Sequence, residues 1–376
     1  MEREIVEKIT RLRHELHADP ELSMQERRTK QRLMEFIKDN TALSVVDCGL
    51  WFYAYYPCGQ EDAERIAFRA DFDALPMEEG LALPYGSKNK GVSHKCGHDG
   101  HSAALAGLAM EIDRRGAKRD VYFIFQHAEE IGAGGAACAA LLIEKGISRV
   151  YAFHNISGYP QGSIVLKEGV AQCTSKGFTV RMTGSPAHAS QPKDGKNPAA
   201  ALARLVLFTE AKASKKEYAG FVLNTVVQVD VGSRNFGIAA SDGSVSMTMR
   251  ADYEADLRRL ETAIRAEALR LAGEEGLTVS FSEQDFFPET VNDPGAVAAV
   301  RKAAARCGFP VVSMECSFRA SEDFGYYLKV CPGAIFYIGN GEAYPPIHTK
   351  EYDFNDAVLE TAAELFAALA MSCDLC

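Results

Sequence analysis

The chain has 376 residues, of which 47% are hydrophobic and 24% are charged, which suits a folded protein of two domains with a sizeable core. The net charge is −10, and without a basic stripe to neutralise phosphates the chain is not expected to bind nucleic acid. No run approaches the ~20 apolar residues of a membrane span and no signal-peptide core follows the charged N-terminus, so we expect a cytoplasmic protein with no membrane partner.

Both ends of the chain, on either side of its middle part, alternate between predicted helices and predicted strands. Residues 2–18 have apolar side chains at helical spacing, and residues 29–37 continue this pattern. Short aromatic or β-branched runs then alternate with helical stretches, and they lie at 51–56, 66–68, 121–125, 150–153 and 334–338. Near-continuous apolar strands between helices predict an α/β fold whose sheet is covered on both faces.

The middle of the chain has a different pattern. It reads as a strand, a helix, two strands, a helix and a strand, over residues 178–182, 198–211, 222–231, 244–250, 256–271 and 277–281. This βαββαβ order is that of the ferredoxin-like unit. We therefore predict an inserted domain over residues 174–284, and a first domain formed by residues 1–173 and 285–376 that ends with a helix over 355–371.

Histidines cluster in one part of the sequence, since five of the nine fall between residues 94 and 154. The densest segment is 93–101, where Cys96 and His98 offer a thiolate and an imidazole, two ligand types of zinc and similar ions. Gly97 and Gly100 would let the backbone turn so that both side chains reach one pair of metals. A helix is predicted over 102–110, and its free N–H groups would face this loop. A His-rich turn with a structural cysteine is the alternative.

Two adjacent carboxylates, Glu129 and Glu130, follow the predicted strand 121–125 and precede a glycine-rich stretch. Ligands of open α/β sheets bind at the carboxyl ends of strands. Neighbouring carboxylates repel unless a metal neutralises one of them. The simplest interpretation is one metal ligand and one general base, and the alternative is an exposed acidic turn.

Two distant histidines follow predicted strands in the same way. His154 ends the strand 150–153, and His348 comes after the strand 334–338 and a loop. Each alone could be a satisfied structural histidine, but together with the earlier motifs they complete a set of candidate ligands on one side of one sheet: Cys96, His98, Glu130, His154 and His348. Asp73 also follows a strand, and it could orient a ligand histidine or form local turn hydrogen bonds.

These motifs, in this order and spacing, resemble the aminoacylase/carboxypeptidase family of dinuclear metallopeptidases. The most similar members are its amidohydrolases, namely hippurate hydrolases, auxin-conjugate (IAA-amino acid) hydrolases and N-acyl-amino acid deacetylases. The resemblance runs nearly end to end, and the residues that carry it are Arg13-His14-Glu15-Leu16-His17, Pro20-Glu21-Leu22-Ser23, the run 69–76, the run 96–101, Ala128-Glu129-Glu130, His154, Gly184, His188, Ser321-Glu322-Asp323-Phe324, His348 and Tyr352-Asp353-Phe354.

The resemblance implies a mixed-sheet, exopeptidase-like catalytic domain and a ferredoxin-like α+β insertion that acts as lid and dimerisation domain. It implies two divalent ions, of manganese, zinc, cobalt or nickel, held by the five candidate ligands. It further implies that Glu129 is the general base, that Asp73 orients a ligand, and that His188 stabilises the oxyanion in the partner subunit's site. A homodimer through the insertion is expected.

The sequence departs from the family pattern at three places. His127 stands where the family has proline before Ala-Glu-Glu, Lys193 follows Pro192 where histidine is usual, and the family's Asn-Val-Ile-Pro segment appears as Asn235-Phe236-Gly237-Ile238. In relatives these sites border the substrate-carboxylate pocket. None of these departures falls on a candidate metal ligand, so the metal-binding pattern is complete, while substrate recognition is expected to differ.

The predicted function is metal-dependent hydrolysis of the amide bond of an N-acyl amino acid, or a related small-molecule amide conjugate, releasing a carboxylic acid and an amino acid. One alternative is a metallocarboxypeptidase or dipeptidase of the same family. A second is a non-catalytic binding protein on a decayed hydrolase scaffold. A third is a zinc-stabilised structural or redox protein that uses Cys96 and the terminal pair Cys373 and Cys376.

Overall fold

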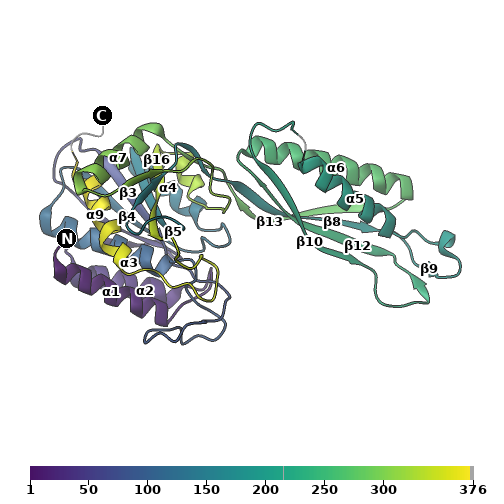
Figure 1. Cartoon of the computed structure of the whole chain (residues 1–376), viewed down its shortest axis with the longest axis horizontal. Coiled ribbons are helices and arrows are strands. Elements are labelled where there is room, and N and C mark those ends of the chain that lie inside the picture. The colour runs from purple at the N-terminus through teal and green to yellow at the C-terminus, as the bar shows by residue number, and fades with distance from the viewer. Residues whose placement is uncertain (215, 373–376) are drawn as a thin grey trace. The chain divides into compact units, whose positions relative to one another are not determined.

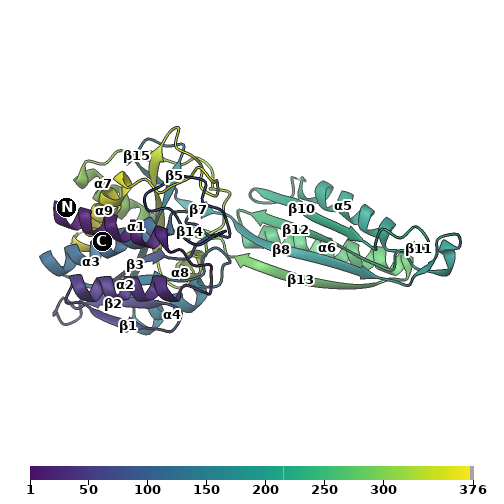
Figure 2. The same ribbon diagram turned by 90° about the horizontal axis from the view of Figure 1, so that it is seen from below.

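The computed structural model describes residues 1–214 and 216–372, and the cysteines of the terminal CxxC pair lie outside these ranges. The chain forms two compact units (Figures 1 and 2). The first comprises Met1–Ala171, Thr290–Ser317 and Asp323–Cys376, and the second comprises Gln172–Glu289 and Phe318–Glu322. The range predicted for the insertion, 174–284, falls inside the second unit. Within the described residues, no helix is both long and apolar enough to cross a membrane.

The first unit is built on an eight-stranded sheet in the order β1-β2-β4-β3-β5-β16-β6-β15. The bounds are β1 (Ser44–Asp47), β2 (Phe52–Tyr56), β3 (Arg65–Asp71), β4 (Asp120–Gln126), β5 (Arg149–Ser157), β6 (Ile164–Leu166), β15 (Val311–Ser313) and β16 (Gly333–Gly341). The four central strands β4, β3, β5 and β16 run parallel to one another, whereas β2 pairs antiparallel with β4 and β6 pairs antiparallel with β16. The sheet is mixed, so the predicted fold class is confirmed.

Helices cover both faces of this sheet. Their bounds are α1 (Arg3–Ala18), α2 (Arg27–Asn40), α3 (His98–Arg115), α4 (Gly135–Lys145), α7 (Pro294–Cys307), α8 (Gly325–Leu328) and α9 (Ala357–Met371). Apolar residues of α1, α2, α3, α7 and α9 share one buried cluster, and those of α4 and α8 share another on the opposite face. A short two-stranded sheet pairs β7 (Gly169–Gln172) with β14 (Thr290–Asn292).

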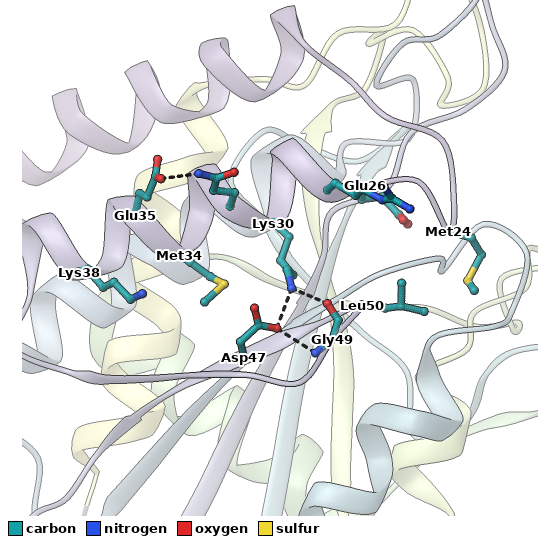
Figure 3. A pocket seen from close by; sticks show the side chains of 11 residues that line it. Met24, Glu26, Lys30, Met34, Glu35, Lys38, Asp47, Gly49 and Leu50 are labelled. Carbon is teal, nitrogen blue, oxygen red and sulfur yellow. Dashed lines mark hydrogen bonds and ion pairs between the residues drawn. The ribbon is translucent and has the colours of Figure 1, made fainter.

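A cavity of about 550 Å3 lies between α2 and the residues that follow β1 (Figure 3). Lys30 of α2 donates a hydrogen bond of 2.7 Å to Asp47 and another to the carbonyl of Gly49. The cavity is lined by Met24, Glu26, Arg27, Lys30, Gln31, Met34, Glu35, Lys38, Asp47, Gly49 and Leu50. The charged groups of this wall are therefore partly paired with one another.

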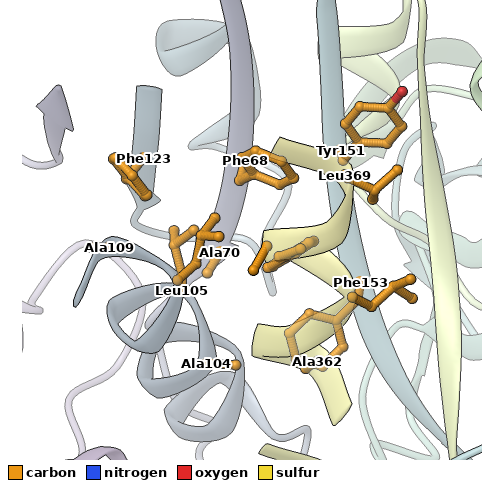
Figure 4. Packing of buried hydrophobic residues seen from close by; sticks show 14 of the residues in the cluster. Phe68, Ala70, Ala104, Leu105, Ala109, Phe123, Tyr151, Phe153, Ala362 and Leu369 are labelled. Atoms are coloured by element: carbon orange, nitrogen blue, oxygen red, sulfur yellow. The ribbon is translucent and has the colours of Figure 1, made fainter. Parts of the chain in front are cut away.

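The central strands are apolar on both faces because both faces are buried. Every residue of β4 is buried, and its side chains alternate, so that Phe123 belongs to one cluster and Tyr122 to the other. Phe68 and Phe123 project from the sheet into the buried cluster to which Leu105 of α3 and Ala362 of α9 also belong (Figure 4). This packing fixes the ends of the strands from which the candidate ligands extend.

The second unit has a four-stranded antiparallel sheet in the order β10-β12-β8-β13. Its elements are β8 (Thr174–Thr183), α5 (Ala199–Ala213), β10 (Val222–Val231), β12 (Asp242–Ala251), α6 (Glu254–Glu275) and β13 (Thr278–Phe287). Their sequence is βαββαβ. Alternate residues of β12, such as Val245 and Met247, are buried in a cluster with α5 and α6. A small pair, β9 (Ala187–His188) and β11 (Ile238–Ala239), and a short 3-10 helix over Pro192–Asp194 complete the unit.

Candidate metal centre and catalytic loop

The turn at Gly97 brings Cys96 and His98 to one place. Gly97 has φ +113°, and a Cβ at this position would lie 2.2 Å from Oδ1 of Asn155, so only glycine fits. Helix α3 starts at His98, four residues earlier than predicted. Gly100 therefore lies in the first turn of the helix and not in a bend, and its missing side chain makes room for the ring of Phe354.

Two histidines approach the thiol of Cys96. Its Sγ lies 3.4 Å from Nε2 of His154 and 3.3 Å from Nε2 of His348. Nδ1 of His154 lies 2.7 Å from the carbonyl oxygen of Asn155. Because a carbonyl only accepts, Nδ1 carries the proton, and the lone pair on Nε2 faces the thiol.

The ring of His98 is also oriented by a hydrogen bond from its Nδ1, here to Asp73. Its Nδ1 lies 3.0 Å from both the carbonyl and the Oδ1 of Asp73, so Nδ1–H is the donor. Its Nε2 has no hydrogen-bond partner within the described residues, and it lies 3.8 Å from carboxylate oxygens of Glu129 and Glu130. Oε1 of Glu130 is in turn 3.7 Å from Nε2 of His348. All five predicted ligands and Glu129 thus come together in the first unit.

Asp73 connects the metal loop, which carries Cys96 and His98, with the acidic loop, which carries Glu129 and Glu130. Its Oδ1 accepts from His98, and its Oδ2 accepts from the backbone N–H of Glu130 at 3.0 Å and from the hydroxyl of Ser23 at 2.7 Å. Asp73 is fully buried, and these donors hold its pKa below the ordinary value against the opposing effect of burial. The carboxylate therefore fixes both a ligand ring and the backbone of the acidic loop.

The electrostatics of the cluster fit a cation. Burial, with Glu130 nearby, raises the pKa of the Cys96 thiol well above its ordinary value, and burial raises the pKa of Glu130 to about 7. Burial also lowers the pKa of His154, which keeps the ring neutral. A cation would reverse the first two effects, because metal ligands bind in their deprotonated form. Thiolate, imidazole and carboxylate donors with unpartnered buried atoms are what a transition-metal site requires.

Residues around the candidate ligands support the centre, and one of them, Asn155, could not be recognised from the sequence. His101 belongs to the histidine cluster but is not free to bind a metal, because its Nδ1 lies 2.7 Å from Asp71 and its Nε2 lies 2.7 Å from Oδ1 of Asn155. Asn155 donates from Nδ2 to the carbonyl of Cys96 at 3.2 Å and to the hydroxyl of Tyr352 at 2.7 Å. Asn155 thereby holds the backbone of the metal loop.

Asp323 holds together the ends of β3 and β4 and the start of α4. Its Oδ2 accepts from the backbone N–H of Gly135 at 2.7 Å, at the start of α4. Its carboxylate also accepts from Gln126 and from Arg69, whose guanidinium donates to Asp71 as well. These contacts fix the ends of β3 and β4, which carry the catalytic loops.

His188 lies in β9 of the second unit and is exposed. Its Nδ1 accepts from the backbone N–H of Ser190 at 3.2 Å and lies 2.7 Å from the Ser190 hydroxyl. Because an N–H only donates, this tautomer carries its proton on Nε2. The ring therefore offers an outward hydrogen-bond donor.

Comparison with known proteins identifies the family. The model of peptidase family M20/M25/M40 matches residues 67–372. The chain belongs to this family. The N-acetylcysteine deacetylase of Bacillus subtilis (strain 168) is 31% identical over 97% of this chain and 96% of its own. The hippurate hydrolase of Campylobacter jejuni is 28% identical over 96% of this chain and 95% of its own. The crystal structure of a dinuclear metal binding peptidase of the M20 family from Bacillus subtilis is 28% identical, with a TM-score of 0.82 and 98% coverage of both chains.

Membership of the M20 family confirms the resemblance predicted from the motifs. The protein is a metal-dependent hydrolase of amide bonds, as predicted. A non-catalytic scaffold is disfavoured by the centre itself, because each of the five candidate ligands and Glu129 is present and converges with the others.

Proposed function

We propose that this member of the M20 family hydrolyses the amide bond of N-acyl amino acids or closely related conjugates, and releases a carboxylic acid and an amino acid. The observation that carries the proposal is the convergence of Cys96, His98, Glu130, His154 and His348 beside Glu129. The names of the relatives, a deacetylase of N-acetylcysteine and a hippurate hydrolase, support this substrate class.

The five ligands would hold two divalent ions, of manganese, zinc, cobalt or nickel. When bound, such ions lower the pKa of a water molecule towards ~7 and polarise an amide carbonyl. Glu129 would take a proton from the attacking water and deliver it to the leaving nitrogen. Asp73 keeps the His98 ring in the orientation that leaves Nε2 free.

His188 would stabilise the oxyanion that forms when the carbonyl is attacked. A donor at Nε2, with Nδ1 engaged by Ser190, has the chemistry that an oxyanion hole needs. In this proposal the second unit acts as a lid that excludes water from the reaction, and the protein functions in the cytoplasm.

A substrate panel tests the reaction class. The metal-reconstituted protein should hydrolyse N-acetyl amino acids or N-benzoylglycine at least ~10-fold faster, in kcat/KM, than dipeptides, because a deacylase recognises an acyl group where a dipeptidase recognises a free amine. Release of the free amino acid measures the rate. A preference for dipeptides would favour the alternative, a metallocarboxypeptidase or dipeptidase of the same family.

We further propose a homodimer formed through the second unit. Strand β10 is an edge of its sheet and exposes Val227 and Val229, while the adjacent helix α5 exposes Leu207. The opposite edge strand, β13, exposes mainly polar residues, among them Ser282, Glu283 and Gln284, with Phe286 as an exposed apolar residue near its end. An apolar exposed edge favours pairing with another copy.

Val227→Lys should convert the dimer to a monomer, because a charge would be placed on the pairing edge. Light scattering of the purified protein measures the mass. Leu269→Lys is the matched control, since Leu269 is 57% exposed on α6 and Val227 is 62% exposed on β10. A monomeric wild type, or equal dissociation by both substitutions, would contradict the proposed interface.

A further inference from the structure

The connection between α1 and α2 contacts two segments of the centre, one after β3 at Asp73 and one after β4 at Ala128. The hydroxyl of Ser23 donates to Oδ2 of Asp73 at 2.7 Å. The carboxylate of Glu26 accepts from the backbone N–H of Ala128 at 2.8 Å. Neither residue is a candidate metal ligand, but Ser23 contacts the residue that orients His98, and Glu26 contacts the residue before Glu129.

Ala128 has an unusual backbone conformation. Its φ is +48°, a left-handed value that residues other than glycine rarely adopt. Its carbonyl accepts from the N–H groups of Ala133 and Gly134 at 3.1 and 3.3 Å. A conformation of this kind persists only where the surroundings hold it, and the N–H of Ala128 is held by the hydrogen bond that it donates to the Glu26 carboxylate.

Glu129 therefore lies between two anchored peptide groups. On its N-terminal side the N–H of Ala128 is bound by Glu26, and on its C-terminal side the N–H of Glu130 is bound by Asp73 at 3.0 Å. Both acceptors are buried carboxylates, with exposed fractions of 4% for Glu26 and 1% for Asp73. The direction of the Glu129 side chain depends on both.

We propose that Glu26 is a positioning residue for the reaction, and that it acts by accepting the hydrogen bond that fixes Ala128 and hence the Glu129 carboxylate. The inference rests on the proposed function, in which Glu129 is the general base. A misplacement of ~1 Å at a catalytic group can cost about 10²-fold in rate. The hydrogen bond that the Glu130 N–H donates to Asp73 does not involve Glu26, so the metal ligands keep their own anchor.

Besides the N–H of Ala128, the Glu26 carboxylate interacts with backbone groups of its own segment, at Met24 and Glu26, and no cationic side chain among the described residues holds it. Lys30, which lines the same cavity, is bound to Asp47 and Gly49 (Figure 3), and no ion pair to Glu26 occurs in the part of the chain that the structure describes. The cavity also means that a shorter side chain at this position opens onto existing space. Glu26→Ala should therefore fold without a rearrangement of the core.

Three variants of the metal-loaded enzyme test the proposal. Glu26→Ala should lower kcat by about 10- to 100-fold, with KM within about threefold of wild type and an unchanged metal content. Glu26→Gln keeps an acceptor oxygen and should stay within about threefold of the wild-type kcat. Glu35→Ala is the control, because Glu35 lines the same cavity but bonds to Gln31 of its own helix, and it should behave as wild type.

Hydrogen exchange provides a readout that does not depend on turnover. Amides of residues 127–131 should exchange faster in Glu26→Ala than in wild type, Glu26→Gln or Glu35→Ala. The proposal is overturned if Glu26→Ala keeps its kcat, if Glu26→Gln loses as much activity as Glu26→Ala, or if excess metal restores the loss. A wild type that hydrolyses none of the tested amides would instead count against the proposed function, while the exchange experiment would still test the anchor.

Discussion

Replacement of Glu129 by glutamine should leave the metal content unchanged and lower kcat by roughly 10²-fold or more. The amide of glutamine has nearly the shape of the carboxylate but cannot take a proton from water. Glu129 is buried and lies 3.8 Å from Nε2 of His98, within the group of candidate ligands but not needed as one of the five. Metal analysis of the purified variant and its kcat on the best amide substrate measure the two effects.

The neighbouring residue is the matched control. Glu130→Gln removes a ligand with its charge, so this variant should lose metal as well as activity, and part of its activity should return at high metal concentration. Near-wild-type turnover by Glu129→Gln would rule out Glu129 as the general base. Loss of metal from Glu129→Gln to the same extent as from Glu130→Gln would show that the two roles are not divided as proposed.

The fold could be predicted where burial leaves a strong pattern. Strands β3, β4, β5 and β16 are apolar on both faces, and the sequence identified each of them. Strands β6 and β15 have three residues each, which is too short for any periodicity to be recognised. The start of α3 was predicted four residues late, because its N-cap is a glycine with no side-chain cap to mark it.

The candidate centre could be predicted because its ligands are chemically distinctive and follow strands whose carboxyl ends meet at one edge of the sheet. The supporting contacts could not, because they join ordinary residues across long stretches of chain. Asn155 contacts the metal loop through the carbonyl of Cys96, and Glu26 contacts Ala128 across 102 positions. An asparagine or a glutamate in an amphipathic sequence has many possible partners, and only the folded arrangement selects one.

Removal of the bound metal should abolish the activity and destabilise the first unit. Without a cation, the carboxyl groups of Asp71, Asp73 and Glu129 are buried around one site beside the partly buried Glu130, and the raised pKa values of the Cys96 thiol and Glu130 favour their protonated forms. A ligand present at 100 times its Kd stabilises the folded state by about 2.7 kcal/mol, which corresponds to a rise in Tm of roughly 5–10 °C. Thermal unfolding with a chelator and after addition of manganese, zinc, cobalt or nickel measures this shift, and the rate on the same samples measures recovery.

Cys96→Ala should remove most of the metal-dependent rise in Tm and lower the activity by at least ~10²-fold, because the Sγ that lies within 3.4 Å of both His154 and His348 is lost. Cys316→Ala is the matched control, since this thiol is exposed and belongs to none of the groups of candidate ligands in the described residues. It should keep both the shift and the rate. Activity that survives complete chelation would mean that any metal is structural and that the hydrolase mechanism proposed for Glu129 is wrong. A rise in Tm with metal but no recovery of activity would separate a zinc-stabilised fold from a catalytic centre.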